Sequence, residues 1–167
     1  MAGRAGEAAD DARRALALAR EIGNPGVELL ALAELSLGAD YAGDHDEAVR
    51  LARQAGQITV GVPGGLARHC SSVLTIVLAG AGDPAEAERV GAAGLARARD
   101  AGDLWNQVLL LSRIMDLDLR AGRTGDAAAH LREGLRLAVR TGTWLTCSLA
   151  YPSAGRCAPR PGAPPRP

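Results

Sequence analysis

The feature that most constrains the fold of this chain is a seven-residue pattern, Ala-Gly-x-x-x-Glu/Asp-Ala, which occurs four times. The copies span 2–8, 42–48, 81–87 and 121–127, so they begin 40, 39 and 40 residues apart. Self-similarity at a fixed period of about 20–50 residues is typical of repeat architectures, in which one supersecondary unit stacks on the next. We therefore expect a chain built from stacked copies of a single unit.

The pattern has the chemistry of a boundary between two helices. Its Gly suits the left-handed conformation that ends a helix. In two copies the next residue, Asp44 or Asp83, is a good N-cap, and Glu47 or Glu86 three residues later would complete a capping box. Pro84 falls at a first helical position, where its missing N–H costs nothing. Each copy is expected to end one helix, turn and begin another.

A second set of helix ends lies about twenty residues after each copy. The segments Gly23-Asn24-Pro25, Gly102-Asp103 and Thr141-Gly142-Thr143 each end one helix and cap the next, while 60–65 forms a longer break. The predicted helices span 5–22, 25–41, 45–58, 65–80, 84–101, 104–120 and 125–140.

Composition agrees with an all-helical fold. Apolar residues make up 47% of the chain, but aromatic residues only 2%, and Phe is absent. Strands favour aromatic and β-branched residues, whereas Ala and Leu favour closely packed helices. We predict an all-α protein, an α-solenoid of antiparallel helical hairpins with a period of about forty residues. Residues 1–150 would hold three complete hairpins plus partial repeats at both ends, and 151–167 a disordered Pro-rich tail.

Two of the predicted helices have a clear apolar stripe. In 125–140 the stripe is formed by residues three or four apart, and in 104–120 the same spacing recurs. The predicted buried residues are Ala128, Leu131, Leu135 and Ala138 in the first, and Leu104, Val108, Leu111, Met115 and Leu119 in the second.

Charge and cysteine content exclude several classes of function. Nineteen basic and nineteen acidic residues cancel, so no broad field attracts nucleic acid or an anionic membrane. All the basic residues are Arg; without Lys the chain holds no Walker-type nucleotide site. Three cysteines without C-x-x-C spacing indicate a reducing compartment, and no signal peptide or membrane-spanning run is present. We expect a cytoplasmic protein.

Residues that could carry chemistry do not form a catalytic or metal site. His45 stands between two aspartates, but consecutive helical residues do not share a face. His69 and Cys70 have no further His or Cys at the spacing that zinc requires. His130 is expected on a helix surface. We assign no catalytic, metal-binding or cofactor-binding residue, and predict that the chain is not an enzyme and needs no cofactor.

The chain resembles tetratricopeptide repeat proteins. Their turn signature, G-[D/N]-x-x-E-A, is matched at 43–48 and 82–87, and more loosely at 3–8 and 122–127. Seven residues after the last Ala, where the family places a small residue because neighbouring helices nearly touch, this chain has small residues too. These are Ala15, Ala55, Gly94 and Gly134. The period of about forty exceeds the usual 34.

Longer hairpins of this kind resemble the helical arm of large MalT/LuxR-type ATP-dependent bacterial transcriptional regulators. In that family an NTPase precedes the arm and a helix-turn-helix follows it. The chain opens on the turn pattern and breaks off a further helix after residue 143, so we expect a truncated or frameshifted piece of such a regulator. The alternative is a stand-alone tetratricopeptide adaptor.

The resemblance also implies a binding surface. In tetratricopeptide arrays the first helix of each hairpin lines a concave groove that receives a protein or peptide. In a regulator of the kind described above, the bound partner would include other domains of the same protein. The resemblance implies no direct contact with nucleic acid or membrane. The matching positions are Leu30, Ala33, Leu37, Asp40, Tyr41, His69, Ser72, Ile76, Leu109, Ser112, Asp116, Leu119 and Arg120.

Overall fold

The computed structural model describes the backbone of residues 2–58 and 61–142, and side chains from residue 7 onward. The described residues are helical apart from short turns and contain no strand. Each predicted helix is present, and its ends lie within three residues of the prediction. The helices are α1 (Ala2–Glu21), α2 (Pro25–Ala42), α3 (His45–Gln57), α4 (Gly64–Gly80), α5 (Pro84–Asp100), α6 (Leu104–Arg120) and α7 (Thr124–Thr141). The tail predicted at 151–167 lies outside the described residues.

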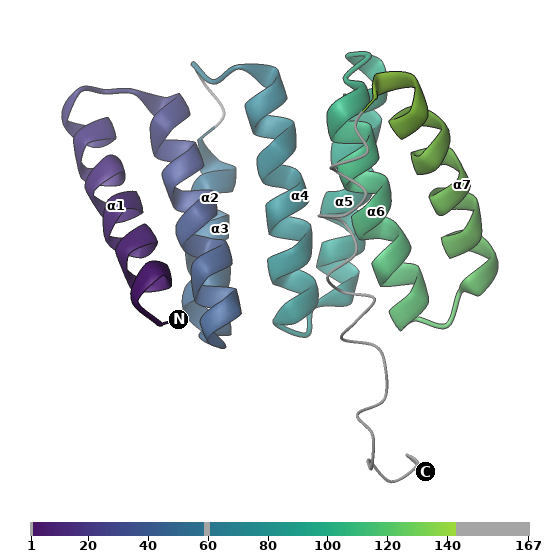
Figure 1. The fold of residues 1–167 in the computed structure, drawn as a ribbon, viewed down its shortest axis with the longest axis horizontal. Helices are drawn as coiled ribbons and strands as arrows, with labels where there is room; N and C mark the ends of the chain where they lie inside the picture. The colour runs from purple at the N-terminus through teal and green to yellow at the C-terminus, as the bar shows by residue number, and fades with distance from the viewer. Residues whose placement is uncertain (1, 59–60, 143–167) are drawn as a thin grey trace, which may run out of the picture.

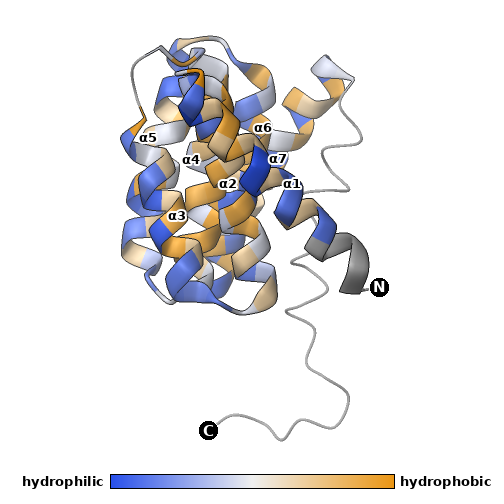
Figure 2. Ribbon diagram, turned by 90° about the vertical axis from the view of Figure 1, so that its left-hand side faces the viewer, coloured by the Kyte–Doolittle hydropathy of each residue, from blue (hydrophilic) through white to orange (hydrophobic). Residues whose placement is uncertain are grey.

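The helices follow one another in space in the order of the sequence. Each packs against the helix before it and the helix after it, and in addition α2 contacts α4 and α4 contacts α6. The even-numbered helices therefore form one layer, with α3 and α5 behind it (Figure 1). Seen from the side, α1 and α7 lie away from α3 and α5 (Figure 2). The fold is an α-solenoid of antiparallel hairpins, as predicted.

We call the side of α2, α4 and α6 that turns away from α3 and α5 the inner face. It is the broad side that faces the reader in Figure 1, between α1 and α7. The opposite side, formed by α3 and α5, is the outer face. This distinction decides which predicted binding residues a partner could reach.

The predicted helix caps are present, but the capping boxes are not. Asp44 accepts a hydrogen bond from the backbone N–H of Glu47 at 3.2 Å, and Asp83 caps α5 in the same way. In a capping box the Glu carboxylate would accept the N–H of the capping residue. That N–H already donates to the carbonyl of Ala39 at 2.9 Å, and Glu47 pairs with Arg50 instead. The predicted capping box is wrong because the C-terminal end of the preceding helix already accepts the hydrogen bond of the Asp44 backbone N–H.

Three of the four turn patterns end a helix with a left-handed glycine. Gly43, Gly82 and Gly122 have φ values of 85°, 83° and 76°, a conformation that other residues rarely adopt. The first copy does not, because Gly3 lies inside α1, which begins at Ala2. A turn at the first copy was therefore a wrong expectation.

The core lies between the two layers. The largest fully buried side chains include Leu29 and Leu32 of α2, Leu78 of α4, and Leu110 and Leu111 of α6. The core divides into clusters that each join adjacent helices, so every hairpin is covered by its neighbours in line. That is the packing expected of a repeat array.

The predicted apolar stripes are correct only in part. On α6, Leu119 is 47% exposed, although Val108 and Met115 are buried. On α7, Leu135 is exposed and the buried residues are Ala127, Leu137 and Ala138. Because α7 packs closely along α6 and meets α5 only through side chains such as Glu133, its covered strip is narrower than its apolar surface.

The small-residue position is closest-packed at Gly94 of α5. A Cβ on Gly94 would lie 2.9 Å from the Cβ of Ser71 and 3.1 Å from Cδ2 of Leu110. At the equivalent Gly134 of α7 the nearest such atom is the Cβ of Leu111, at 3.7 Å. The close approach that the resemblance implied is thus tight in the middle of the array and looser at its end.

None of the described helices is both long enough and apolar enough to cross a bilayer.

Candidate partner-binding face

The inner face of α2 exposes part of the predicted binding set. Leu30 is 40% exposed and Tyr41 is 68% exposed, while Leu37 and Asp40 are half-buried. Ala33 is buried in the core and is not available to a partner. The α2 surface is therefore a mixed strip, in which the exposed Glu34 lies between Leu30 and Leu37 and an aromatic residue lies near the C-terminal end.

On α4 the predicted residues are less accessible. His69 and Ile76 are half-buried, and Ser72 is only 2% exposed. This helix lies between α2 and α6, which both contact it. It forms the middle of the inner face and offers little side-chain surface of its own.

On α6, too, some of the predicted binding residues are accessible and others are buried. Leu119 and Arg120 are exposed, Ser112 and Asp116 are half-buried, and Leu109 belongs to the core. Of the thirteen predicted residues, those buried beyond reach are Ala33, Ser72 and Leu109. They occupy helix positions turned toward a neighbouring helix, and a position count relative to the turn pattern does not detect that.

Two exposed apolar residues of these helices were absent from the predicted set. Val27 on α2 and Trp105 on α6 are both more than two-fifths exposed. Val27 precedes Leu30 by three residues, and Trp105 precedes Leu109 by four, so helical spacing could have found both. By contrast, α3 and α5 expose no large apolar side chain.

An arginine that was not predicted lies among these residues. The Arg113 side chain on α6 is largely buried, and its Nε has no hydrogen-bond partner among the described residues. Burial lowers its pKa, and the nearby Tyr41 and Asp116 partly offset this shift because they favour the charged form. Since Tyr41 belongs to α2 and Arg113 to α6, the two side chains approach each other across α4. A buried guanidinium is costly unless its donors are satisfied.

Asp40 has a structural role at the C-terminal ends of α2 and α4. One oxygen of its carboxylate, Oδ1, lies within hydrogen-bond distance of His45 Nδ1, at 3.1 Å. It also lies against Gly80, where an added Cβ would come within 2.6 Å of Oδ1. The position of Asp40 therefore depends on Gly80 having no side chain.

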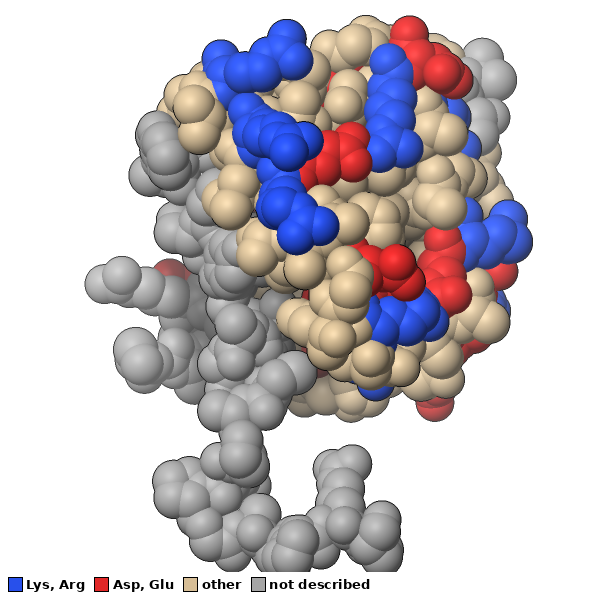
Figure 3. All heavy atoms as spheres, turned by 90° about the vertical axis from the view of Figure 1, so that its right-hand side faces the viewer, with Lys and Arg blue, Asp and Glu red and all other residues tan. Residues whose placement is uncertain are grey.

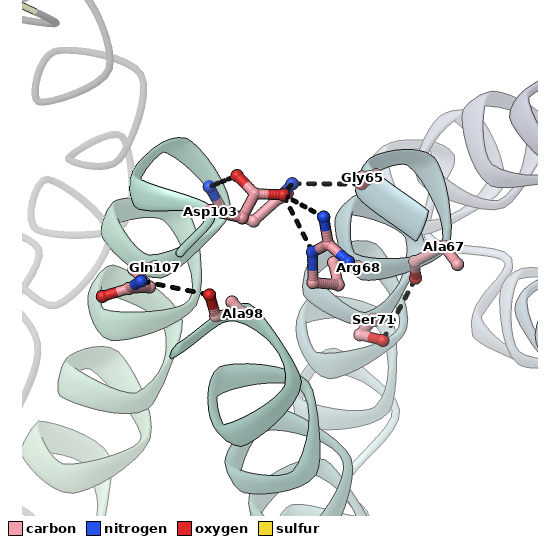
Figure 4. A network of polar contacts seen from close by, with 8 residues as sticks. Gly65, Ala67, Arg68, Ser71, Ala98, Asp103 and Gln107 are labelled. Atoms are coloured by element: carbon pink, nitrogen blue, oxygen red, sulfur yellow. Dashed lines mark hydrogen bonds and ion pairs between the residues drawn. The ribbon is translucent and has the colours of Figure 1, made fainter. Parts of the chain in front are cut away.

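A polar network joins α4 to the start of α6, as Figure 4 shows. Asp103 caps α6 at the N–H of Asn106, and its Oδ2 lies 2.7 Å from an Arg68 terminal nitrogen. Asn106 also donates to the carbonyl of Gly65 at 3.0 Å. Partial burial tends to raise the pKa of Asp103, but the hydrogen bonds from Asn106 and the ion pair with Arg68 hold it below its usual value. The network fixes the two helices at one end of the inner face.

His130 is partly exposed on α7, with 29% of its side chain accessible, but it has an acidic partner that the sequence analysis did not predict. Its Nδ1 is 2.8 Å from Oδ2 of Asp118, and the Asp118 side chain is only 5% exposed. Arg123 binds the other oxygen of the same carboxylate at 2.9 Å. The acid comes from the preceding helix, so no search within α7 could have found it.

Cys70 is buried in the core. Burial first, and the nearby negative charge of Glu34 second, raise the pKa of its thiol to about 12. A nucleophilic cysteine needs the thiolate near neutral pH, so Cys70 is packed as an apolar residue.

The structure also contains an open hollow of about 550 Å³ on the outer side of the array. It is lined by α3, the end of α4 and the turn before α5, including Arg50, Arg53 and Gln54. None of the predicted binding residues lines it. Among the described residues, no group of three or more His, Cys, Asp or Glu side chains is placed to hold a metal ion.

Comparison with protein-family models gives no match, and neither does comparison with curated proteins. The class that the fold defines is an all-α helical-hairpin solenoid.

Proposed function

We propose that this chain is a protein-interaction or sensory repeat segment whose inner face binds an apolar or amphipathic segment of a protein partner. The observation that carries the proposal is the distribution of exposed apolar side chains. Leu30 and Tyr41 on α2, with Trp105 and Leu119 on α6, border the inner face, whereas α3 and α5 expose none. The end helices α1 and α7 also expose apolar side chains, at Leu18, Leu135 and Val139, and Ile22 directly after α1 is exposed too. Large apolar side chains left exposed on one face of a protein are typical of interaction sites.

Covering the exposed apolar side chains of the inner face would contribute a favourable free energy of binding. Burying a Leu side chain completely is worth about 1.5–3 kcal/mol. Leu30 and Leu119 are already more than half buried, so covering each would add about 1 kcal/mol. Tyr41 and Trp105 are of the residue types that contribute most to binding energies at interfaces.

The resemblance of the turn patterns supports a more specific proposal: a piece of a MalT/LuxR-type transcriptional regulator. In such a protein the solenoid would couple the binding of an effector or partner to transcription, and the partner could be another domain of the same regulator. A stand-alone adaptor is the alternative. Reading the flanking DNA separates the two. An upstream Walker motif and a downstream helix-turn-helix in neighbouring frames are expected for the regulator, and their absence favours the adaptor.

Site-specific photocrosslinking tests the binding face itself. A photoreactive phenylalanine analogue at Leu30 or Leu119 is expected to capture the same partner in cells of the source organism. The same analogue at Arg89, an exposed position on α5 of the outer face, is the matched control and should capture none. A partner that crosslinks equally well from Arg89 would exclude the inner face as its site.

A variant then links the crosslink to affinity. The double substitution Leu30→Glu and Leu119→Glu places two charges on the inner face and should lower the yield of the complex at least about tenfold. Both side chains are partly exposed, so we expect the helical content to be unchanged, as circular dichroism can verify. A complex that survives this change would refute the proposed face.

A further inference from the structure

The last described helix carries a row of basic side chains outside the inner face. Arg132, Arg136 and Arg140 follow one another at every fourth residue of α7, so they share one side of the helix. All three are exposed. Figure 3 faces this end of the array and shows basic side chains gathered in a column.

This row is not neutralised by the described part of the chain. No carboxylate of a described residue lies within ion-pair distance of Arg132, Arg136 or Arg140. Other arginines nearby are engaged: Arg99 binds Glu133 at 2.7 Å, and Arg123 binds Glu88 at 2.6 Å. The only acid on the last three turns of α7, Glu133, is thus occupied by α5.

The sequence that follows α7 has no side chain to neutralise the row. Residues 143–167 include Arg156, Arg160 and Arg166 but no Asp or Glu. The α7 arginines are thus open to a carboxylate that the described residues do not supply.

Apolar side chains stand next to the basic row. Leu135 and Val139 lie on α7 one turn apart, and they are 39% and 58% exposed. Leu135 follows Arg132 by three residues and Val139 follows Arg136 by three, so the two apolar residues and the three arginines form one continuous helix face. We call these five residues the α7 basic face.

We propose that the α7 basic face binds an amphipathic acidic helix of a partner protein, with carboxylates one turn apart beside a row of apolar residues. The Cβ atoms of residues i and i+4 of a helix are about 6 Å apart, so acidic residues at this spacing match the spacing of the arginines. A guanidinium binds a carboxylate through two parallel hydrogen bonds. The exposed Leu135 and Val139 favour a protein helix over phosphates, because phosphates give apolar side chains nothing to pack against. This site is distinct from the inner face.

A designed peptide pair tests the proposal with the full chain. The probe is a helical peptide of about 20 residues, with Glu at every fourth position over three turns beside a row of Leu. The control peptide has Gln in place of each Glu. Fluorescence anisotropy is expected to give affinity for the Glu peptide at least about tenfold higher than for the Gln peptide, with the difference shrinking as salt is raised from about 50 to about 500 mM. Equal affinity for both peptides would overturn the proposal.

Protein variants locate the site. The triple variant R132Q/R136Q/R140Q should lose the preference for the Glu peptide. The matched control R13Q/R14Q/R89Q removes the same charge from exposed arginines elsewhere and should keep it. Loss of the preference in the control, or its retention in the α7 variant, would refute the assignment.

Reversing the charge of the three arginines provides a second test in case the triple glutamine variant has an altered fold. R132E/R136E/R140E should reject the Glu peptide and bind a peptide with Lys in place of Glu. Failure of this exchange with unchanged circular dichroism would contradict the proposal. A wild-type dimer that dissociates on R132Q/R136Q/R140Q substitution would show that a second copy, not a partner helix, occupies the face.

Discussion

Gly94 and Gly134 occupy the same position of successive repeats, yet we expect opposite effects when each is replaced by Ala. Both lie in the interior of a helix, where Ala is favoured over Gly by about 1 kcal/mol. What differs is the space for a methyl group. At Gly134 the new Cβ would meet Leu111 at an ordinary contact distance of 3.7 Å, whereas at Gly94 it would lie 2.9 Å from the Cβ of Ser71.

The close contact at Gly94 is with an atom that cannot move by itself. The Cβ of Ser71 is fixed to the backbone of α4, so relief requires α4 and α5 to separate. Leu110 on the other side, at 3.1 Å, can adjust its side chain. Overpacking of this kind costs about 1–3 kcal/mol. After the gain in helix propensity, Gly94→Ala should lower the free energy of unfolding by about 1 kcal/mol. Gly134→Ala should raise it by about 1 kcal/mol.

Urea unfolding and thermal unfolding, both followed by far-ultraviolet circular dichroism, measure the difference. For a domain of this length 1 kcal/mol corresponds to about 2–4 °C in melting temperature, so the two variants should melt about 6 °C apart. Gly56→Ala on α3 is a further control, because its Cβ would meet nothing closer than 3.9 Å, and it should also stabilise. If Gly94→Ala stabilises the chain as much as these controls, the close packing of α4 against α5 is refuted.

Two further predictions concern ionisable groups. Because the pKa of Asp103 is held below its usual value, its ionised form contributes stability that is complete above about pH 4 and is lost as the pH falls through its folded-state pKa. Asp103→Asn should therefore lower the free energy of unfolding by about 2 kcal/mol at pH 7, and this deficit should shrink as the pH falls through the lowered pKa. A deficit independent of pH would exclude the ionised carboxylate as its cause. For Cys70, with a thiol pKa of about 12, we expect no alkylation by iodoacetamide at about pH 8 in a chain carrying Cys147→Ser and Cys157→Ser until denaturant is added. Rapid alkylation of the folded chain would contradict the buried position.

Helix ends were the most predictable part of this protein, since local residues decide them. A left-handed Gly such as Gly82, followed by the capping residue Asp83 and then Pro84, ends one helix and starts the next with little help from distant residues. The capping boxes failed for an equally local reason that the pattern did not include. The preceding helix end supplied a carbonyl to the N–H that the Glu would have bound.

The candidate binding face was less predictable. Counting from the turn pattern placed Leu30 and Leu119 correctly at the surface, but it could not separate them from Leu109, which the neighbouring helices bury. Arg113 was missed because an isolated Arg in a helix gives no sign that another helix will cover it. Its environment depends on Tyr41, which is 72 residues earlier in the chain.

The sequence by itself determined that the chain is a succession of helical hairpins and where each helix begins and ends, because glycine conformation, capping and helical periodicity act over a few residues. Only the tertiary structure decided which side of each helix is covered and which charges meet. Arg68 pairs with Asp103, and Asp118 pairs with His130, because the array brings their helices side by side. Burial and long-range pairing depend on that relative placement of helices, which no local pattern encodes.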